Sequence, residues 1–129
     1  MSTNQRLGAI RGATTVDSNT PEAIVAATEE LLSELLDRNG AGRDQLISLI
    51  FTSTPDLTAE FPAAAARRMG LSDVALLCAT EIAVPTAVGG CIRVLVHLYT
   101  DRQWADLEHV YLRGAKGLRA DLDQPEVEP

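Results

Sequence analysis

Arginines in or beside apolar segments are the residues of this sequence whose type and place first suggest chemistry. Arg11, Arg93 and Arg119 lie in or next to stretches that read as strands, and Arg67 lies near the end of a short Ala-rich segment. A guanidinium among core-forming residues is costly unless an anion pairs with it. For a single arginine that anion is usually an Asp or Glu of the same chain. Four together could instead bind a carboxylate ligand, because arginine contacts carboxylates through two parallel donors.

Glu81 is a carboxylate where none is expected. It lies within the apolar run 74–84, and an unpaired charge is disfavoured in such surroundings. It either pairs with one of the arginines or faces a polar cavity, and its position in the sequence favours neither alternative.

The sequence gives little support for covalent, metal or nucleotide chemistry. Cys78 has no recognisable His-Asn partners and reads as a small core residue. His97 and His109 have no neighbouring ligand at a metal-binding spacing, so we expect surface or packing residues and no metal. Gly89 and Gly90 precede a strand, and no GxGxxG pattern occurs. We therefore predict an enzyme or binding protein without a cofactor.

Charge and composition exclude several classes of partner. The net charge of −7 argues against nucleic-acid binding, which normally needs a basic stripe. Arg93 and His97 interrupt the longest apolar stretch, so no segment reaches the roughly 18 residues that span a bilayer, and we expect no membrane association. The first residues lack the apolar segment of a signal peptide, and the two cysteines form no disulfide framework. A cytoplasmic location is expected.

The hydrophobic pattern predicts one α+β domain over residues 1–129, in which a mixed sheet packs on one long helix and on short helices. Strands are expected at 7–16, 46–53, 74–82, 91–100 and 109–118. Helices are expected at 21–39 and 61–69, with a helical turn at 104–107. Thr20 is the expected N-cap of the long helix and Gly40 ends it. A right-handed βαβ crossover should connect the first two strands, and the acidic residues 120–129 should form a loose tail.

Two of these strands have distinct faces. The first would place Arg11 on one face with Ala9 and Ala13, and the strand at 91–100 has one wholly apolar face. Aromatic residues are only 4% of the chain, so its core depends on smaller side chains. This composition suggests burial against partner subunits.

Six motifs, taken together, resemble the AroH-class chorismate mutases in order and spacing. They are IRGATTV at 10–16, TPDL at 54–57, FPAxAxR at 61–67, the strand with Glu81, CIRV at 91–94 and HVYL at 109–112. The resemblance spans about residues 7–121, and six motifs in register are hard to explain by chance. It implies an isomerase that converts chorismate to prephenate, without a cofactor, in phenylalanine and tyrosine biosynthesis. It also implies an AroH-like pseudo-α/β-barrel homotrimer with active sites between subunits.

The resemblance assigns roles to residues of one subunit. Arg11, Arg93 and Tyr111 would face the enolpyruvyl carboxylate of chorismate, and Arg93 would also reach the ether oxygen. Glu81 and the region of Cys78 would meet the ring hydroxyl. The catalytic residues implied are therefore Arg93, Glu81, Arg11 and Tyr111.

Other residues are implied to complete the substrate-binding site. Phe61, Ala63 and Arg67 would close it from the adjacent subunit, while Leu118 and Arg119 would cover it from the C-terminal end. The sequence departs from the family pattern at two places, because Ala64 stands where a basic residue is usual and Leu77 where a hydroxyl residue is usual. Substrate affinity could change as a result, whereas the catalytic set is complete.

Two other functions fit parts of the pattern. A trimeric module could bind a small carboxylate without converting it, because similar folds host unrelated functions. A small deaminase-like enzyme acting on imino acids could use a similar interface cleft. The joint presence of Arg93, Glu81 and Tyr111 favours the mutase over both.

Overall fold

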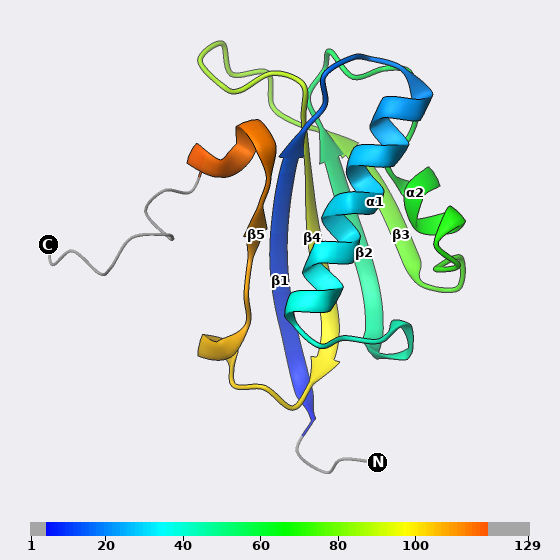
Figure 1. Ribbon diagram of the computed structural model, residues 1–129, viewed down its shortest axis with the longest axis vertical. Helices are drawn as coiled ribbons and strands as arrows, with labels where there is room; N and C mark the ends of the chain where they lie inside the picture. Colours follow the sequence, from blue (N-terminus) through cyan, green and yellow to red (C-terminus); the bar gives the residue numbers. More distant parts are fainter. Residues whose placement is uncertain (1–4, 119–129) are drawn as a thin grey trace, which may run out of the picture.

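A mixed β-sheet organises the molecule (Figure 1). The computed structural model describes residues 5–118. In this part of the chain the strands have the spatial order β3-β2-β4-β1-β5. They are β1 (Arg6–Thr15), β2 (Leu46–Ser53), β3 (Ala75–Thr80), β4 (Cys91–Thr100) and β5 (Val110–Tyr111). The helices are α1 (Pro21–Arg38) and α2 (Ala63–Arg68), with short 3-10 helices at Arg43–Gln45, Trp104–Asp106 and Arg113–Gly117. The predicted α+β class is confirmed.

β4 is the central strand of the sheet. It pairs antiparallel with β1 on one side and with β2 on the other. The outer pairs, β2 with β3 and β1 with β5, are parallel. The chain crosses from β1 to β2 through α1, as predicted, but β4 lies between these two strands. Three segments distant in sequence are thus brought side by side.

α1 begins and ends close to the signals in the sequence. The Thr20 hydroxyl accepts a hydrogen bond from the Ala23 amide at 3.2 Å. Pro21 occupies the first helical position, where a missing N–H costs nothing. At the other end the Asn39 side chain donates to the Glu108 carbonyl oxygen at 2.9 Å. Asn39 therefore ties the end of the helix to the segment before β5.

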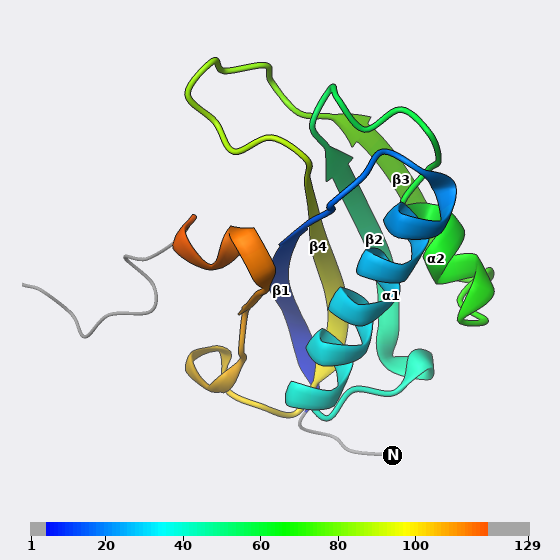
Figure 2. The same ribbon diagram turned by 45° about the horizontal axis from the view of Figure 1, so that its top comes forward.

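The main core lies between the sheet and the two helices, which Figures 1 and 2 show on the same side of the sheet. The predicted apolar face of β4 is buried on this side of the sheet, where Val94, Val96 and Leu98 lie in the main core and Ile92 packs with Ile24 and Leu57. Gly12 of β1 lies directly under α1. A Cβ at this position would lie only 2.9 Å from Cδ1 of Leu31. The absence of a side chain is what allows α1 to approach β1 so closely.

The opposite face of the sheet, which we call the open face, is covered only at one end within residues 5–118. There the 3-10 helix Arg113–Gly117 packs through Ala115 on Ala13 and Cys91. Elsewhere on this face large side chains stay exposed, including Leu7 at 52% and Leu77 at 60%. Much of this face therefore has no intramolecular cover within residues 5–118.

The last strand is much shorter than predicted. The pattern extends it over 109–118, whereas β5 contains only Val110–Tyr111. Shortly after it, Arg113 has a φ of 52°, in the left-handed region that a continuing strand does not use. Its guanidinium pairs with Glu30 of α1, with Nε 2.9 Å from Oε1. This contact turns the chain into a 3-10 helix, because tertiary anchoring outweighs the local strand pattern.

Other predicted boundaries differ slightly. β1, β3 and α2 were expected at 7–16, 74–82 and 61–69, and each differs from its observed bounds by one or two residues at its ends. The predicted tail at 120–129 lies outside the described residues. Neither helix of residues 5–118 combines the length and the apolar character needed to cross a bilayer.

Candidate active site

Three predicted site residues meet around Ala13 on the open face. Arg93 lies opposite Ala13 in the pair of β1 with β4, and Tyr111 lies opposite it in the pair of β1 with β5. Arg11 precedes Ala13 by two residues on the same strand, so both side chains leave the same face. The three residues come from three adjacent strands, which explains how positions 11, 93 and 111 share one site.

Glu81 joins this group through an ion pair with Arg93. The Arg93 Nε lies 3.1 Å from Oε2 of Glu81, and the two side chains are 40% and 15% exposed. Thr52 donates a hydrogen bond from Oγ1 to the same oxygen at 3.0 Å. Glu81 follows β3, and its amide extends the ladder by donating to the Ser53 carbonyl at 2.9 Å. Of the two alternatives left open by the sequence, pairing with an arginine is the one observed. We call Arg11, Glu81, Arg93 and Tyr111 the arginine cluster.

Cys91 forms the buried floor beside this cluster. Burial raises the pKa of its thiol, and the positive charge of Arg93 offsets only part of that rise. The Cys91 amide donates to Thr54 Oγ1 at 2.9 Å. A protonated thiol in this place acts as a small packing residue.

A second hydrogen bond fixes the neighbouring loops. The Gly90 amide donates to Asp56 Oδ2 at 2.8 Å, and Gly90 has a φ of 58°, which glycine adopts without strain. The hydrogen bond with Thr54 is the main cause that holds the pKa of Asp56 below its usual value, and the Gly90 amide adds to it. These contacts anchor the start of β4, and hence Arg93, to the loop after β2.

His109 has a structural role that the sequence did not suggest. The Arg11 amide donates to His109 Nδ1 at 2.9 Å. Nδ1 can accept only when it carries no proton. The contact ties β1 to the segment before β5 at the site itself. The two residues are 98 positions apart, so no local motif could have signalled it.

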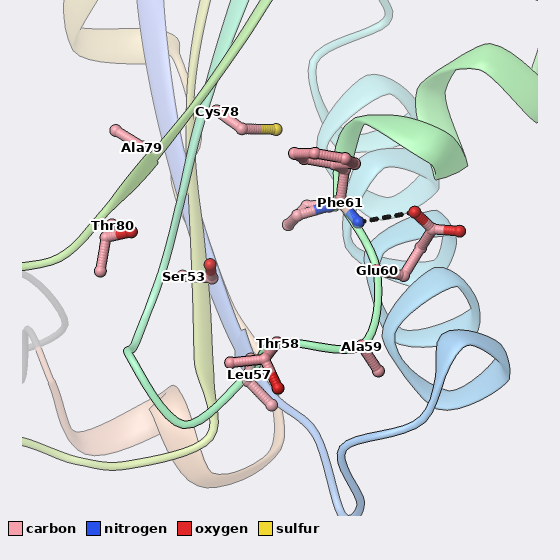
Figure 3. Close-up of a pocket in the computed structure, with 10 residues that line it drawn as sticks. Ser53, Leu57, Thr58, Ala59, Glu60, Phe61, Cys78, Ala79 and Thr80 are labelled. Carbon is pink, nitrogen blue, oxygen red and sulfur yellow. Dashed lines mark hydrogen bonds between the residues drawn. The ribbon is translucent and has the colours of Figure 1, made fainter.

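A second group of predicted residues lies on the helix side of the sheet. Phe61 and Cys78 border two neighbouring cavities of about 370 and about 300 Å³. Figure 3 shows the Cys78 sulfur pointing toward the Phe61 ring. Ala63 and Arg67 of α2 line the smaller cavity. We call these four residues the Phe61 wall, and Phe61 in it is 64% exposed.

The side chains of Cys78 and Glu81 lie on opposite faces of the sheet. Cys78 packs toward the main core, opposite Phe51, whereas Glu81 reaches Arg93 on the open face. Successive side chains of a strand alternate between faces, so residues three apart point to opposite sides. The spacing of 78 and 81 already contained this signal. Within one chain, Cys78 belongs with Phe61.

Two of the predicted site arginines have no carboxylate partner within residues 5–118. They are Arg11 in the arginine cluster and Arg67 in the Phe61 wall, whereas the adjacent Arg68 pairs with Glu29 at 3.5 Å. An unpaired guanidinium at a cavity or cluster is free to bind an anion. Both groups therefore offer positive charge to a carboxylate ligand.

Of the two C-terminal residues predicted to cover the site, only Leu118 lies within the described part of the chain. Leu118 packs with Tyr111 on the small cluster of Ala13, Cys91 and Ala115. Arg119 lies outside the described residues. Leu118 thus lies next to the arginine cluster, as a covering residue would.

The arrangement supplies fixed charges and hydrogen-bond donors. In the described part of the chain, no three side chains of His, Cys, Asp or Glu gather as metal ligands would. The chemistry these residues can support is electrostatic stabilisation of an anionic substrate whose charge moves during reaction.

The sequence is similar to those of known proteins over most of its length. Residues 7–122 match the family described as chorismate mutase type I. A curated relative, chorismate mutase AroH of Thermus thermophilus, is 50% identical over 115 residues, which are 88% of this chain and 94% of the relative. Chorismate mutase AroH of Bacillus subtilis (strain 168) is 38% identical over 114 residues, covering 88% of this chain and 90% of the relative.

A solved structure shares the fold. The structure of a chorismate mutase from Clostridium thermocellum superposes with a TM-score of 0.83 at 55% sequence identity. The match covers 84% of this chain and 96% of that one.

Proposed function

The chain belongs to the type I chorismate mutase family, and we propose that it converts chorismate to prephenate in clefts that two neighbouring copies build together. The arginine cluster of one copy would form one side of each cleft, and the Phe61 wall of the next copy the other side. Prephenate would then serve phenylalanine and tyrosine biosynthesis.

The reaction explains why charged donors suffice. It is an intramolecular Claisen rearrangement, in which one bond breaks as another forms, without an acid, a base or a nucleophile. The protein can accelerate it by holding the reactive conformer and by matching the charge of the transition state. An arginine-lined site does both.

Arg93 would stabilise the ether oxygen. Negative charge grows on this oxygen as the C–O bond breaks, so a fixed cation there binds the transition state more strongly than the substrate. The pair with Glu81 uses the Nε of Arg93. Its terminal amino groups form no hydrogen bond within residues 5–118 and remain available for substrate.

Arg11, Tyr111 and Glu81 would orient the substrate. Arg11 and Tyr111 flank Ala13 on the same face as Arg93 and would take the enolpyruvyl carboxylate. Glu81 would accept a hydrogen bond from the ring hydroxyl. Each contact restricts the substrate to the folded conformer that reacts.

A neighbouring copy is needed because the two groups of one chain lie on opposite faces of the sheet. Phe61, Ala63, Arg67 and Cys78 would enclose the substrate from that copy, and Leu118 with Arg119 would cover the cleft. The exposed Leu7 and Leu77 support a closed homotrimer packed through the open face. Exposed apolar surface of this kind is typical of subunit interfaces.

Arg11 and Arg93 together favour an enzyme over a carboxylate-binding module. A binding module needs cations only at the substrate carboxylates. Here Glu81 holds a second cation, Arg93, which lies on the strand next to that of Arg11 and pairs with Ala13, two residues after Arg11. Loss of chorismate absorbance with the purified protein, without added metal or cofactor, tests the proposal. A flat trace would refute it.

The two adjacent arginines of α2 provide a matched pair of variants. Arg67→Gln should raise KM about tenfold, because it removes a charge from the Phe61 wall. Arg68→Gln should leave KM unchanged, because Arg68 pairs with Glu29 of α1 instead. Equal effects of the two changes would withdraw Arg67 from the site.

A further inference from the structure

We propose that Thr52 is a positioning residue of the reaction, acting through Glu81. The inference rests on the proposed function and extends it to a side chain that touches the catalytic pair but not the substrate. Thr52 Oγ1 donates to Glu81 Oε2 at 3.0 Å, and Arg93 Nε donates to that same oxygen at 3.1 Å.

The position of Thr52 in the sheet makes it a rigid support. It lies opposite Arg93 in the pair of β2 with β4, and opposite Ala79 in the pair of β2 with β3. Glu81 follows Ala79 by two residues and leaves the same face. The Thr52 hydroxyl therefore lies between the two partners of the ion pair, on a strand that is hydrogen-bonded on both sides.

The two donors to Oε2 determine what the other oxygen can do. Within residues 5–118 no hydrogen bond is formed to Oε1 of Glu81. This oxygen is consequently the one that can accept the ring hydroxyl of the substrate. The hydrogen bond from Thr52 also fixes the position of the Glu81 carboxylate, because a hydrogen bond to a charged acceptor is stronger than one between neutral groups.

Without the Thr52 hydroxyl, the ion pair would change its geometry. Guanidinium and carboxylate groups prefer two parallel hydrogen bonds. The freed Glu81 carboxylate can rotate into this arrangement with Arg93, which uses Oε1 and one terminal amino group of the arginine. Both groups would then be lost to the substrate. Thr52 limits the ion pair to a single hydrogen bond between Arg93 and Glu81. Oε1 of Glu81 then stays free to accept from the ring hydroxyl, and the terminal amino groups of Arg93 stay free to donate to the ether oxygen.

Variants at position 52 test this role through steady-state kinetics. Thr52→Val keeps the shape and removes the hydroxyl, and it should lower kcat about tenfold with a smaller change in KM, as expected for a lost hydrogen bond to a charged group. Thr52→Ser restores the donor and should retain activity within about threefold. Ser48→Ala is the control, because Ser48 lies on the same face of β2 but contacts His97 at 3.0 Å instead. It should leave kcat unchanged.

A double-mutant cycle separates positioning from a general effect on folding. In a Glu81→Ala background, Thr52→Val should cause less than about a twofold further loss, because the residue it acts through is gone. A tenfold loss in both backgrounds would overturn the positioning role, as would wild-type kinetics of Thr52→Val. If the valine variant does not fold, Thr52→Ser and Thr52→Ala give the same comparison of the hydroxyl. A wild-type protein without turnover would overturn the mutase function together with this inference, whereas the other outcomes leave the mutase function intact.

Discussion

Mixing two differently disabled proteins tests the shared cleft directly. One protein carries Arg93→Gln, which damages the arginine cluster, and the other carries Phe61→Ala with Arg67→Ala, which damages the Phe61 wall. In a single chain these groups lie on opposite faces of the sheet. If each cleft joins the cluster of one copy to the wall of the next, either protein alone should be nearly inactive although assembled.

The expected recovery follows from this arrangement. After joint unfolding and refolding in equal amounts, each cleft has an even chance of an intact cluster and an independent even chance of an intact wall. In a closed cyclic assembly about a quarter of the clefts should therefore be wholly wild type. Turnover of chorismate, followed by its absorbance, should rise to about a quarter of the wild-type rate.

A second mixture provides the control. Arg93→Gln and Glu81→Ala both damage the arginine cluster, and the two residues are paired within one chain at 3.1 Å. No mixture of these two proteins can contain an intact cluster, so no activity should return. Recovery in this control, or none in the first mixture despite subunit exchange shown by native mass spectrometry, would refute the shared cleft.

Three further changes test the site and its support. Arg93→Gln should lower kcat by the factor that corresponds to a loss of roughly 3 kcal/mol of transition-state stabilisation, while changing KM little. An unchanged kcat in steady-state kinetics would remove Arg93 from the mechanism. Gly12→Ala should destabilise the fold by about 1–3 kcal/mol, because its methyl group would meet Leu31 of α1 at 2.9 Å. Urea unfolding measures this, and an unchanged midpoint would show that α1 can shift without cost. Iodoacetamide at neutral pH should label Cys78 and spare the native Cys91, because burial raises the pKa of the Cys91 thiol and alkylation requires the thiolate. Mass spectrometry identifies the labelled thiol, and equal labelling of both would contradict the burial of Cys91.

Local patterns in the sequence predicted most of the elements. The N-cap at Thr20 and Pro21 placed the start of α1, and the alternation over 91–100 placed β4 with the correct face toward the core. These features depend on neighbouring residues alone, through capping and side-chain alternation. The same alternation would have separated Cys78 from Glu81 by face.

The end of the chain shows where local patterns fail. The residues after Tyr111 alternate like a strand, yet Arg113 pairs with Glu30 of α1, 83 positions away, and the chain forms a 3-10 helix. The contact of His109 with Arg11 joins residues 98 positions apart. Interactions at such separations exist only once the sheet and α1 are assembled, so sequence periodicity contains no trace of them.

The sequence by itself determined the residue types of the site, its family resemblance and the strands that carry it. Only the tertiary structure decided which residues share a surface. Insertion of β4 between β1 and β2 places Arg93 beside Ala13 and Thr52, and this makes one group of Arg11, Glu81, Arg93 and Tyr111. The same topology puts the Phe61 wall on the other face. Strand order is set by the packing of the whole sheet against α1, and no single segment of the sequence encodes it.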